Sequence, residues 1–283
     1  MTPLRQAMIR AMQMRGFSVR THKSYLAAVT DLARYCRRSP AALEVKDLHG
    51  YFEHLAVERK LSASSCRLAL NGIRFLYLDV LKREAFDVPI PVPKQPQRIP
   101  ALLSRTEVAR IIAACSDRKY QTMLMLCYGC GLRVSELVSL RVGDIDGERG
   151  RLRIEQGKGG KDRLVPLPPT LLARLRDYWR GYRPKLWLFP GRVAGAPLCP
   201  TSIQKTYTKA KARAGITKIG GIHALRHAYA THQLEAGLPV HRLQRLLGHQ
   251  DIRSTLRYVH WVPDYREGSG THDLIAKLEP GHE

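Results

Sequence analysis

The segment HALRH at residues 223–227, followed by LGH at 247–249 and by Tyr258, decides how the second half of this chain is interpreted. These short segments gather histidine and arginine side chains around one tyrosine, within apolar residues spaced as in helices. Guanidinium and imidazole groups bind phosphate oxygens, and a phenolic oxygen held beside them can attack the phosphorus atom. The stretch therefore predicts a site for chemistry on a phosphate ester.

A helical wheel refines this prediction for the first segment. If residues 222–236 form a helix, its buried stripe contains Ile222, Leu225 and Tyr229. His223 and Arg226 then share one flank and can face one ligand together. His227 completes an i,i+4 histidine pair that would suit zinc, but no HExxH motif is present and no carboxylate lies between the two histidines. We therefore predict no metal site.

The following segment is expected to present a second histidine and the tyrosine. Gly248 is predicted to end a short helix and to leave His249 exposed at the break. Asp251 can cap a further helix whose apolar stripe would be Ile252, Leu256 and Val259. On that wheel Tyr258 lies roughly 120° from the centre of the stripe, so its hydroxyl is expected to be free for chemistry.

The motif GLRVSEL at 131–137 supplies another candidate. Arg133 follows a glycine stop and precedes a new helical turn, where backbone amides could share an anion with its guanidinium group. A surface arginine paired with Glu136, three residues on, is the alternative interpretation.

The segment RLRIEQGKGGKDRLVPL at 151–167 predicts a β-hairpin, because apolar residues alternate on both sides of a GKGG turn. Lys158 lies in the tip, where its ammonium group could reach a bound backbone and deliver a proton. Lys161 is an equally basic neighbour, and Arg163 follows as a further candidate for contact with a polyanion. The spacing of a phosphate-binding P-loop is absent.

The composition points to a polyanionic partner. Lysine and arginine number 47 against 24 aspartates and glutamates, which gives a formal charge of +23 and a pI of about 10.2. Such charge favours nucleic acid, whereas membrane binding lacks the run of about 18 apolar residues that a spanning helix needs. Six scattered cysteines and an N-terminus without a long apolar core predict a cytoplasmic protein. Cys127 and Cys130 form a CxxC within an apolar run and are expected to be buried rather than functional.

The length of 283 residues favours two domains, each with its own core. Residues 1–88 predict a helical bundle: one helix capped by Ser18, one over 45–59, and one starting near Ser62 or Ser64. The apolar stripe of that last helix contains Leu68, Ile73, Leu76, Tyr77 and Val80. A basic face of this bundle is either solvated or in contact with DNA.

Proline-rich residues 89–100 are expected to form a linker. Residues 101–264 predict a second domain, which opens with a capping box of Ser104 and Glu107 and continues with a buried helix at about 119–129. Residues 265–283 form a tail. The predicted fold is mainly α with a small β-hairpin or sheet (α+β). A basic helix near 203–214 carries side chains that could line DNA: Lys205, Lys209, Lys211 and Arg213.

Six positions resemble, in order and residue type, the signature of the tyrosine recombinase (phage integrase) family: Arg133, Lys158, His223, Arg226, His249 and Tyr258. The resemblance covers residues from about 100 to 260, and the N-terminal part is similar in size and pattern to the family's core-binding domain. Within the family, the compact chain resembles Xer-like recombinases. Its basicity favours an enzyme of a mobile element over a chromosome-dimer resolvase, and an integron role is disfavoured because no extra helical insertion precedes His223.

The resemblance implies transesterification on DNA without a metal or nucleotide cofactor. Tyr258 would attack the scissile phosphate and form a 3′-phosphotyrosyl bond, while Arg133, Arg226 and His249 hold the non-bridging oxygens. Lys158 would protonate the leaving oxygen and His223 would assist as base or hydrogen-bond partner. Glu136 would support Arg133.

The family also implies a homo-tetramer on two double-stranded DNA sites, with the tail able to dock on a neighbouring protomer through Leu274, Ile275 and Leu278. Three rival functions share part of the pattern. A type IB topoisomerase-like enzyme would use the same nucleophile without a defined site. A non-catalytic DNA-binding regulator would form no covalent adduct, and a histidine-cluster metallohydrolase would be inhibited by chelators.

Overall fold

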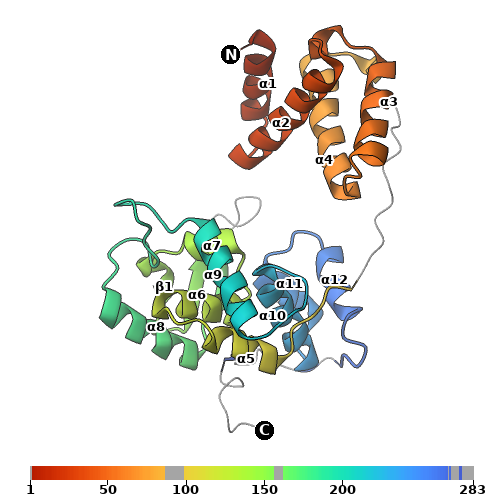
Figure 1. Cartoon of the computed structure of the whole chain (residues 1–283). Helices are drawn as coiled ribbons and strands as arrows, with labels where there is room; N and C mark the ends of the chain where they lie inside the picture. Colours follow the sequence, from red (N-terminus) through yellow and green to blue (C-terminus); the bar gives the residue numbers. More distant parts are fainter. Residues whose placement is uncertain (1, 87–98, 156–161, 267, 269–273, 276–283) are drawn as a thin grey trace. The chain divides into compact units, whose positions relative to one another are not determined.

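The computed structural model describes residues 2–86, 99–155, 162–266, 268, 274 and 275. The chain divides into two compact units, Met1–Arg98 and Ile99–Glu283 (Figure 1). Each unit has its own apolar core. Of the predicted linker at 89–100, the described residues include only Ile99 and Pro100. Within the described ranges, no helix is both long and apolar enough to cross a membrane.

The first unit is a bundle of helices, and two of the predicted caps are confirmed. The backbone N–H of Thr21 donates to Ser18 Oγ at 3.1 Å, and the N–H of Ser65 donates to Ser62 Oγ at 3.3 Å. The first helix was not predicted, although Thr2 caps it and a proline opens it. The helices are α1 (Pro3–Met14), α2 (Val19–Cys36), α3 (Val45–Glu53) and α4 (Ala63–Arg74), and the last two continue as π-helical turns, His54–Glu58 and Phe75–Val80.

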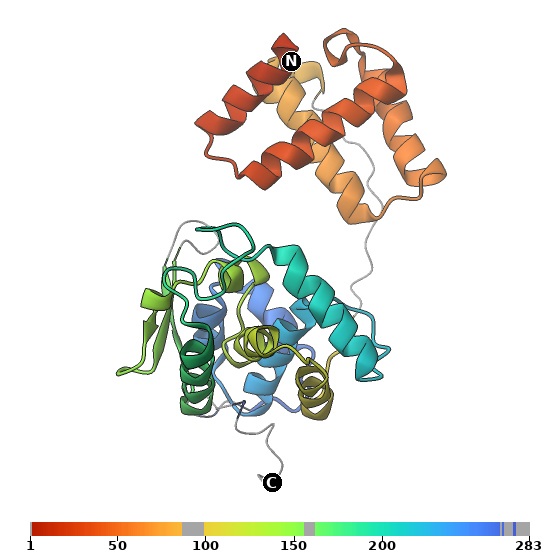
Figure 2. The ribbon, with the colours of Figure 1, turned by 60° about the vertical axis from the view of Figure 1, so that its left-hand side comes forward.

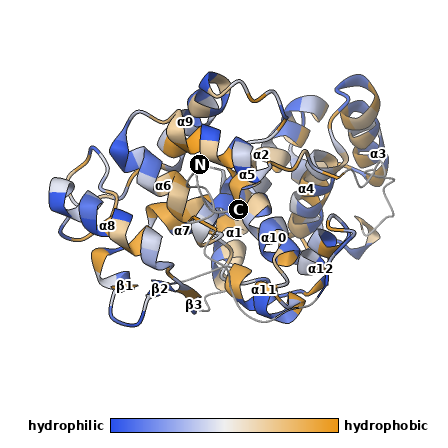
Figure 3. Cartoon of the chain, turned by 90° about the horizontal axis from the view of Figure 1, so that it is seen from below, coloured by the Kyte–Doolittle hydropathy of each residue, from blue (hydrophilic) through white to orange (hydrophobic). Residues whose placement is uncertain are grey.

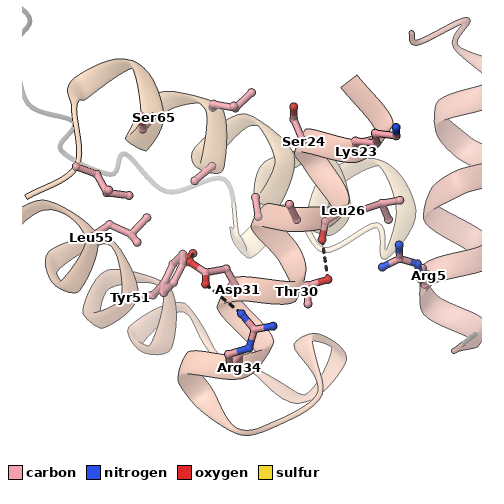
Figure 4. A pocket seen from close by; sticks show the side chains of 15 residues that line it. Arg5, Lys23, Ser24, Leu26, Thr30, Asp31, Arg34, Tyr51, Leu55 and Ser65 are labelled. Atoms are coloured by element: carbon pink, nitrogen blue, oxygen red, sulfur yellow. Dashed lines mark hydrogen bonds and ion pairs between the residues drawn. The ribbon is translucent and has the colours of Figure 1, made fainter. Parts of the chain in front are cut away.

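In this unit α2 packs across α4 (Figure 2). An open groove of about 550 Å³ runs along α2 and is bordered by Arg5, Lys23 and Tyr51 (Figure 4). Leu68 lines this groove and is 45% exposed, so its predicted place in the buried stripe is wrong. Its neighbours in the stripe, Ile73, Leu76 and Tyr77, are buried as predicted.

The second unit is built from helices around α6, whose apolar side chains are buried. The predicted capping box is confirmed: Glu107 N–H donates to Ser104 Oγ at 3.2 Å, and Ser104 N–H donates to Glu107 Oε2 at 2.7 Å. The helices of this unit are α5 (Arg105–Ala113), α6 (Arg118–Gly129), α7 (Val134–Val138), α8 (Pro169–Tyr182), α9 (Pro200–Arg213), α10 (His223–Glu235), α11 (Val240–Leu247) and α12 (Arg253–Val259).

The predicted hairpin is confirmed as part of a three-stranded antiparallel sheet in the order β1-β2-β3. The strands are β1 (Ile145–Asp146), β2 (Arg151–Ile154) and β3 (Arg163–Pro166), with Leu152 opposite Val165. Leu152, Ile154 and Val165 face the core, whereas Leu164 is 54% exposed because alternate residues of a strand face opposite sides. The strand β3 lies against α11 at this edge of the unit (Figure 3). The fold is therefore mainly α with a small sheet, as predicted.

Helix α10 runs through the centre of the second unit and packs against α6, α11 and α12. Its predicted stripe is confirmed, since Ile222, Leu225 and Tyr229 are all buried. Two residues of the predicted tail also join this core: Leu274 and Ile275 are 0% and 4% exposed. They pack within the same chain, and Leu278 lies outside the described residues.

Candidate active site

Glu136 organises the arginine side chains of the site. Arg133 caps α7, and its Nη1 donates to Glu136 Oε1 at 2.6 Å, while its backbone N–H donates to Oε2 at 2.8 Å. From β3, Arg163 donates to both oxygens of the same carboxylate at 2.8 Å. Burial alone would raise the pKa of Glu136, but Arg163 and then Arg133 lower it to about 2. Glu136 is therefore a carboxylate anion throughout the physiological pH range.

Arg226 lies deeper than predicted. It was expected on an accessible flank of α10, but the residue is 1% exposed. Its Nη1 donates to the carbonyl of Gly131 at 2.6 Å and its Nη2 to the carbonyl of Leu247 at 2.7 Å, while Glu136 Oε2 lies 3.8 Å away. Burial and then the charge of Arg133 lower the pKa of Arg226 to about 10, so the guanidinium group remains charged at neutral pH.

His249 follows the left-handed Gly248 that ends α11, as predicted, but the side chain is half-buried rather than exposed. Its Nε2 lies 3.2 Å from Arg226 Nη2, and its Nδ1 lies 2.9 Å from Thr255 Oγ1. Because a guanidinium group can only donate, Nε2 accepts and the proton resides on Nδ1. Burial, followed by Arg226 and Arg133, lowers the pKa of His249 to about 3, so the ring is neutral here.

The orientation of α12 corrects the helical-wheel prediction. Ile252 and Leu256, expected in the buried stripe, are 38% and 40% exposed, whereas Thr255 and Tyr258 are 0% and 4% exposed. The inward face is fixed by polar contacts that hydropathy does not register: Thr255 bonds His249, and Tyr258 Oη lies 2.9 Å from His227 Nδ1. The Tyr258 hydroxyl is therefore not free, and burial raises its pKa although Arg226 opposes the effect.

His227 is the residue of the site that the sequence analysis missed, because it was considered only as a zinc ligand. Its ring lies within aromatic contact of three others: the centroid of His223 is 4.6 Å away, that of Tyr258 5.6 Å and that of Trp261 5.7 Å. His223 is exposed and opens α10. A signal was available, since His227 lies four residues after His223 and therefore near it on the same helix.

The candidates for DNA contact that the structure describes divide into two groups. Lys205, Lys209 and Arg213 are exposed on α9. Arg163 and Lys211 have partners within the protein: the Arg163 side chain is 10% exposed and bonds Glu136, and Lys211 Nζ donates to the carbonyls of Lys218 and Gly220 at 2.7 and 3.0 Å. Both cations are thus held by the protein itself. Lys158 and Lys161 lie outside the described residues.

Together these side chains make a site for an anion. Three guanidinium groups, from Arg133, Arg163 and Arg226, share the Glu136 carboxylate. Three positive charges against one negative charge leave an excess of positive charge among side chains that are largely shielded from water. This excess favours the binding of an anion such as a phosphate. The ring of Tyr258 lies parallel to that of His249, with centroids 6.2 Å apart, so a phenol side chain lies beside the arginine cluster.

Comparisons with known proteins agree with this arrangement. Residues 101–263 match the phage integrase family, and residues 4–87 match the N-terminal SAM-like domain of phage integrases. The putative integrase/recombinase y4qK of Sinorhizobium fredii is 44% identical over 260 residues, which cover 92% of this chain and 84% of the relative. The tyrosine recombinase XerD of Rhizobium meliloti is 31% identical, with coverage of 94% and 91%.

Solved structures show the same fold. A lambda integrase dimer bound to a core site superposes with a TM-score of 0.73 at 19% identity, covering 93% of this chain and 95% of that one. The XerA recombinase superposes with a TM-score of 0.53 at 27% identity, covering 91% and 92%.

A helical fold that holds a tyrosine beside an arginine-rich anion site defines an enzyme of phosphoryl transfer through a covalent tyrosine intermediate. The chain belongs to the phage integrase family. Within that family it is a Xer-like tyrosine recombinase, an enzyme of site-specific DNA recombination.

Proposed function

We propose that Tyr258 is the nucleophile of this recombinase. Its phenolic oxygen attacks the scissile phosphate, forms a 3′-phosphotyrosyl bond and expels a 5′-hydroxyl group. A second strand's 5′-hydroxyl then attacks the phosphotyrosine and restores a phosphodiester. The energy of the phosphoester is retained in the covalent bond, so neither step requires ATP, and no metal is assigned a role.

The observation that carries the proposal is the cluster of three arginines around one carboxylate, with Tyr258 beside it. Arg133 and Arg226 are the two that we assign to the non-bridging oxygens, where charge grows in the transition state. Arg226 Nη2 and Arg133 Nη2 now donate to the carbonyls of Leu247 and Gly248, at 2.7 and 3.1 Å. Both donors therefore lie next to residues 247–249, and we assign the phosphate to a position beside this segment.

The remaining roles follow the chemistry of each side chain. His249 donates to a non-bridging oxygen once phosphate charge offsets the nearby arginines, because that charge raises the pKa of the ring. His223, exposed at the start of α10, is assigned to the same phosphate as a hydrogen-bond partner. Lys158 is assigned to the protonation of the leaving 5′-oxygen, since an ammonium group near neutral pH is a competent acid.

We propose that the exposed cations of α9 contact the phosphate backbone of the DNA: Lys205, Lys209 and Arg213. Lys161 keeps its predicted role as a DNA contact. In the first unit, Arg5 and Lys23 are exposed at the border of the groove in Figure 4, and we assign them to a second stretch of the same duplex. Residues 89–100 then serve as the linker between two DNA-binding parts.

We propose a homo-tetramer on two DNA sites as the active assembly, because strand exchange needs two sites held together. A lambda integrase tetramer bound to a Holliday junction has a similar fold, with a TM-score of 0.72 at 19% identity. The formal charge of +23 supports a role with a mobile element. The scattered cysteines support a location in the cytoplasm. Leu274 and Ile275 are buried in the core of their own chain, so we do not assign them to docking on a neighbouring protomer.

The test is a suicide DNA substrate that carries the recombination site and a nick next to the cleavage position, so that the released fragment diffuses away. In EDTA, the wild-type chain is expected to form an SDS-resistant protein–DNA adduct and Tyr258→Phe none. Tyr265→Phe is the matched control, since it also removes a hydrogen-bonded hydroxyl, which lies 3.1 Å from the Leu238 carbonyl. An adduct that survives Tyr258→Phe would refute the assignment.

The same substrate separates the rival functions. A shuffled duplex of equal composition should give no adduct with a recombinase but an equal yield with a topoisomerase-like enzyme. Tight binding without an adduct on any substrate would favour a DNA-binding regulator. An adduct that forms without EDTA but is lost when EDTA is added would favour a metal-dependent reaction.

A further inference from the structure

The hydroxyl of Tyr258 lies within hydrogen-bond distance of a histidine ring, that of His227. The phenolic oxygen and His227 Nδ1 are 2.9 Å apart, a normal hydrogen-bond length, although the residues are 31 positions apart in sequence. Trp261 packs edge-on against both rings, with centroids 5.1 Å from Tyr258 and 5.7 Å from His227. The contact is thus made by one residue of α10 and one of α12, and a residue of the turn after α12 packs against both.

The protonation state and the tautomer of His227 together decide the direction of this hydrogen bond. Burial, then His223 and Arg226, lower the pKa of His227 to about 4, so the ring is neutral at physiological pH. A neutral ring with its proton on Nε2 has a free lone pair on Nδ1. We assign this tautomer to His227, in which Tyr258 donates its proton to Nδ1.

Among the residues that the structure describes, no other group around the phenol is suited to take its proton. Arg226 and Arg133 are charged donors without a lone pair. His249 uses Nε2 for Arg226 and Nδ1 for Thr255, and its ring lies parallel to that of Tyr258. His223 is exposed and contacts the edge of the His227 ring, at 4.6 Å between centroids.

We propose that His227 is a catalytic residue that accepts the phenolic proton of Tyr258 as Tyr258 attacks the phosphate. The inference rests on the proposed role of Tyr258. In the cleavage step the bond from Tyr258 Oη to phosphorus forms and the bond from phosphorus to the 5′-oxygen breaks. The proton moves from Oη to His227 Nδ1, and the leaving oxygen receives a different proton from its own acid. In rejoining, His227 returns the proton to the departing phenolate.

The charges around His227 connect this transfer to DNA binding. In the free protein, Arg226 and the other cations oppose an imidazolium ion, so the proton stays on Tyr258. A phosphate bound to Arg133 and Arg226 offsets their charge and raises the pKa of the neighbouring imidazole. His227 becomes a better base only when the substrate is in place, which protects the free enzyme from forming a reactive phenolate.

The test uses the full chain and the suicide substrate under single-turnover conditions from pH 5.5 to 9. His227→Asn keeps an acceptor near the position of Nδ1 but cannot hold the proton, whereas His227→Phe removes both functions. Each should bind the substrate as tightly as wild type. His227→Asn should cleave about 100-fold more slowly at pH 7, a typical loss for one general base. His260→Asn, an exposed histidine two residues after Tyr258, is the matched control and should cleave as wild type does.

Two readouts distinguish a proton acceptor from a residue that only supports the fold. Without the base, the phenol must ionise to solvent, so the rate of His227→Asn should rise close to tenfold per pH unit while that of wild type stays nearly flat. Replacing Tyr258 by 3-fluorotyrosine, whose phenol is more acidic, should restore much of the lost rate in His227→Asn and change wild type little.

A cleavage rate of His227→Asn within about threefold of wild type across this pH range would overturn the inference. An equal effect of 3-fluorotyrosine on both proteins would also overturn the inference. This outcome covers the case in which His227→Asn cleaves slowly only because it folds poorly. Failure of the wild-type chain to form any adduct would instead refute the proposed nucleophile, so the two failures are distinguishable.

Discussion

Arg163 and Glu136 form a buried ion pair of the fork-to-fork type, in which both nitrogens of one face of the guanidinium group lie 2.8 Å from the two carboxylate oxygens. The Arg163 side chain also donates through Nε to the carbonyl of Leu246 at 2.9 Å. One side chain from β3 thus ties the sheet to α7 and to the end of α11. Glu136, held in this way, fixes the position of Arg133.

Replacing Arg163 by Met should therefore destabilise the second unit and slow cleavage. Breaking a buried pair while leaving its charged partner costs roughly 3 kcal/mol, although Arg133 still bonds Glu136 and limits the loss. All three tryptophans lie in the second unit, at 179, 187 and 261, so urea unfolding followed by their fluorescence reports this unit alone. Arg151→Met, at an exposed position of β2, is the control. Equal stability of the two variants would contradict the role given to Arg163.

Gly131→Ala should be strongly destabilising, because the residue has a φ of +61° and an added Cβ would lie 2.4 Å from Tyr229 Cδ1. The left-handed backbone and the overlap together should cost roughly 2–5 kcal/mol. Cleavage should also fall, since the Gly131 carbonyl accepts from Arg226. Gly181→Ala is the matched substitution: it has open space in α8 and should stabilise by roughly 0.5–1 kcal/mol. The same urea experiment compares the two, and a loss of similar size in both would show that space at Gly131 is not the cause.

How far the site could be predicted from sequence depends on the kind of interaction that holds each residue. Arg133 was correctly expected to precede a new helical turn, because a local glycine stop decides that feature. Tyr229 was correctly predicted to be buried, because a wide apolar stripe decides its position. The buried face of α12 was predicted wrongly, since hydropathy favours Ile252 over Thr255, whereas the hydrogen bond that His249 Nδ1 donates to Thr255 Oγ1 determines the outcome.

Arg163 and His227 show the same limit. A basic residue in a hairpin is expected to face a polyanion. Only the tertiary fold shows that Arg163 forms an ion pair with Glu136 instead. The partner of His227 lies on another helix, so no local spacing reveals it. Sequence patterns thus identify many of the residues of the site but not His227, and packing decides which side chains meet.

Lys205→Ala and Lys209→Ala should each weaken DNA binding and reduce its dependence on salt. Every lost phosphate contact lowers the slope of log K against log salt by about one. Lys211→Ala, on the same helix, should leave that slope unchanged because its ammonium group is bonded to the carbonyls of Lys218 and Gly220. Fluorescence anisotropy with a labelled duplex at several salt concentrations measures all three. A slope that falls as much for Lys211→Ala would mean that this side chain leaves its carbonyl partners and binds phosphate.

The second unit should lose stability in acid because buried histidines must take up protons when it unfolds. His232 is 4% exposed and bonds the hydroxyl of Tyr128 at 2.9 Å, and burial lowers its pKa to about 4. The unfolded histidine has a pKa near 6.5, so between about pH 4 and 6.5 the unfolded state binds more protons than the folded one. Stability therefore rises with pH in this window and is lost as the pH falls, by up to about 1.4 kcal/mol per pH unit for one such group. His227 and His249 act in the same direction.

His232→Gln removes one of these protons and should flatten the dependence of the urea midpoint on pH between pH 6.5 and 5, while an amide can still bond Tyr128. Tryptophan fluorescence at pH 7, 6 and 5 measures the effect on the second unit. His260→Gln is the control, because that side chain is exposed and its replacement should leave the slope as it is in wild type. If His232→Gln and His260→Gln gave the same slope, His232 would have to be protonated in the folded state, and its bond to Tyr128 would need the opposite direction, with Nδ1 donating to the phenolic oxygen.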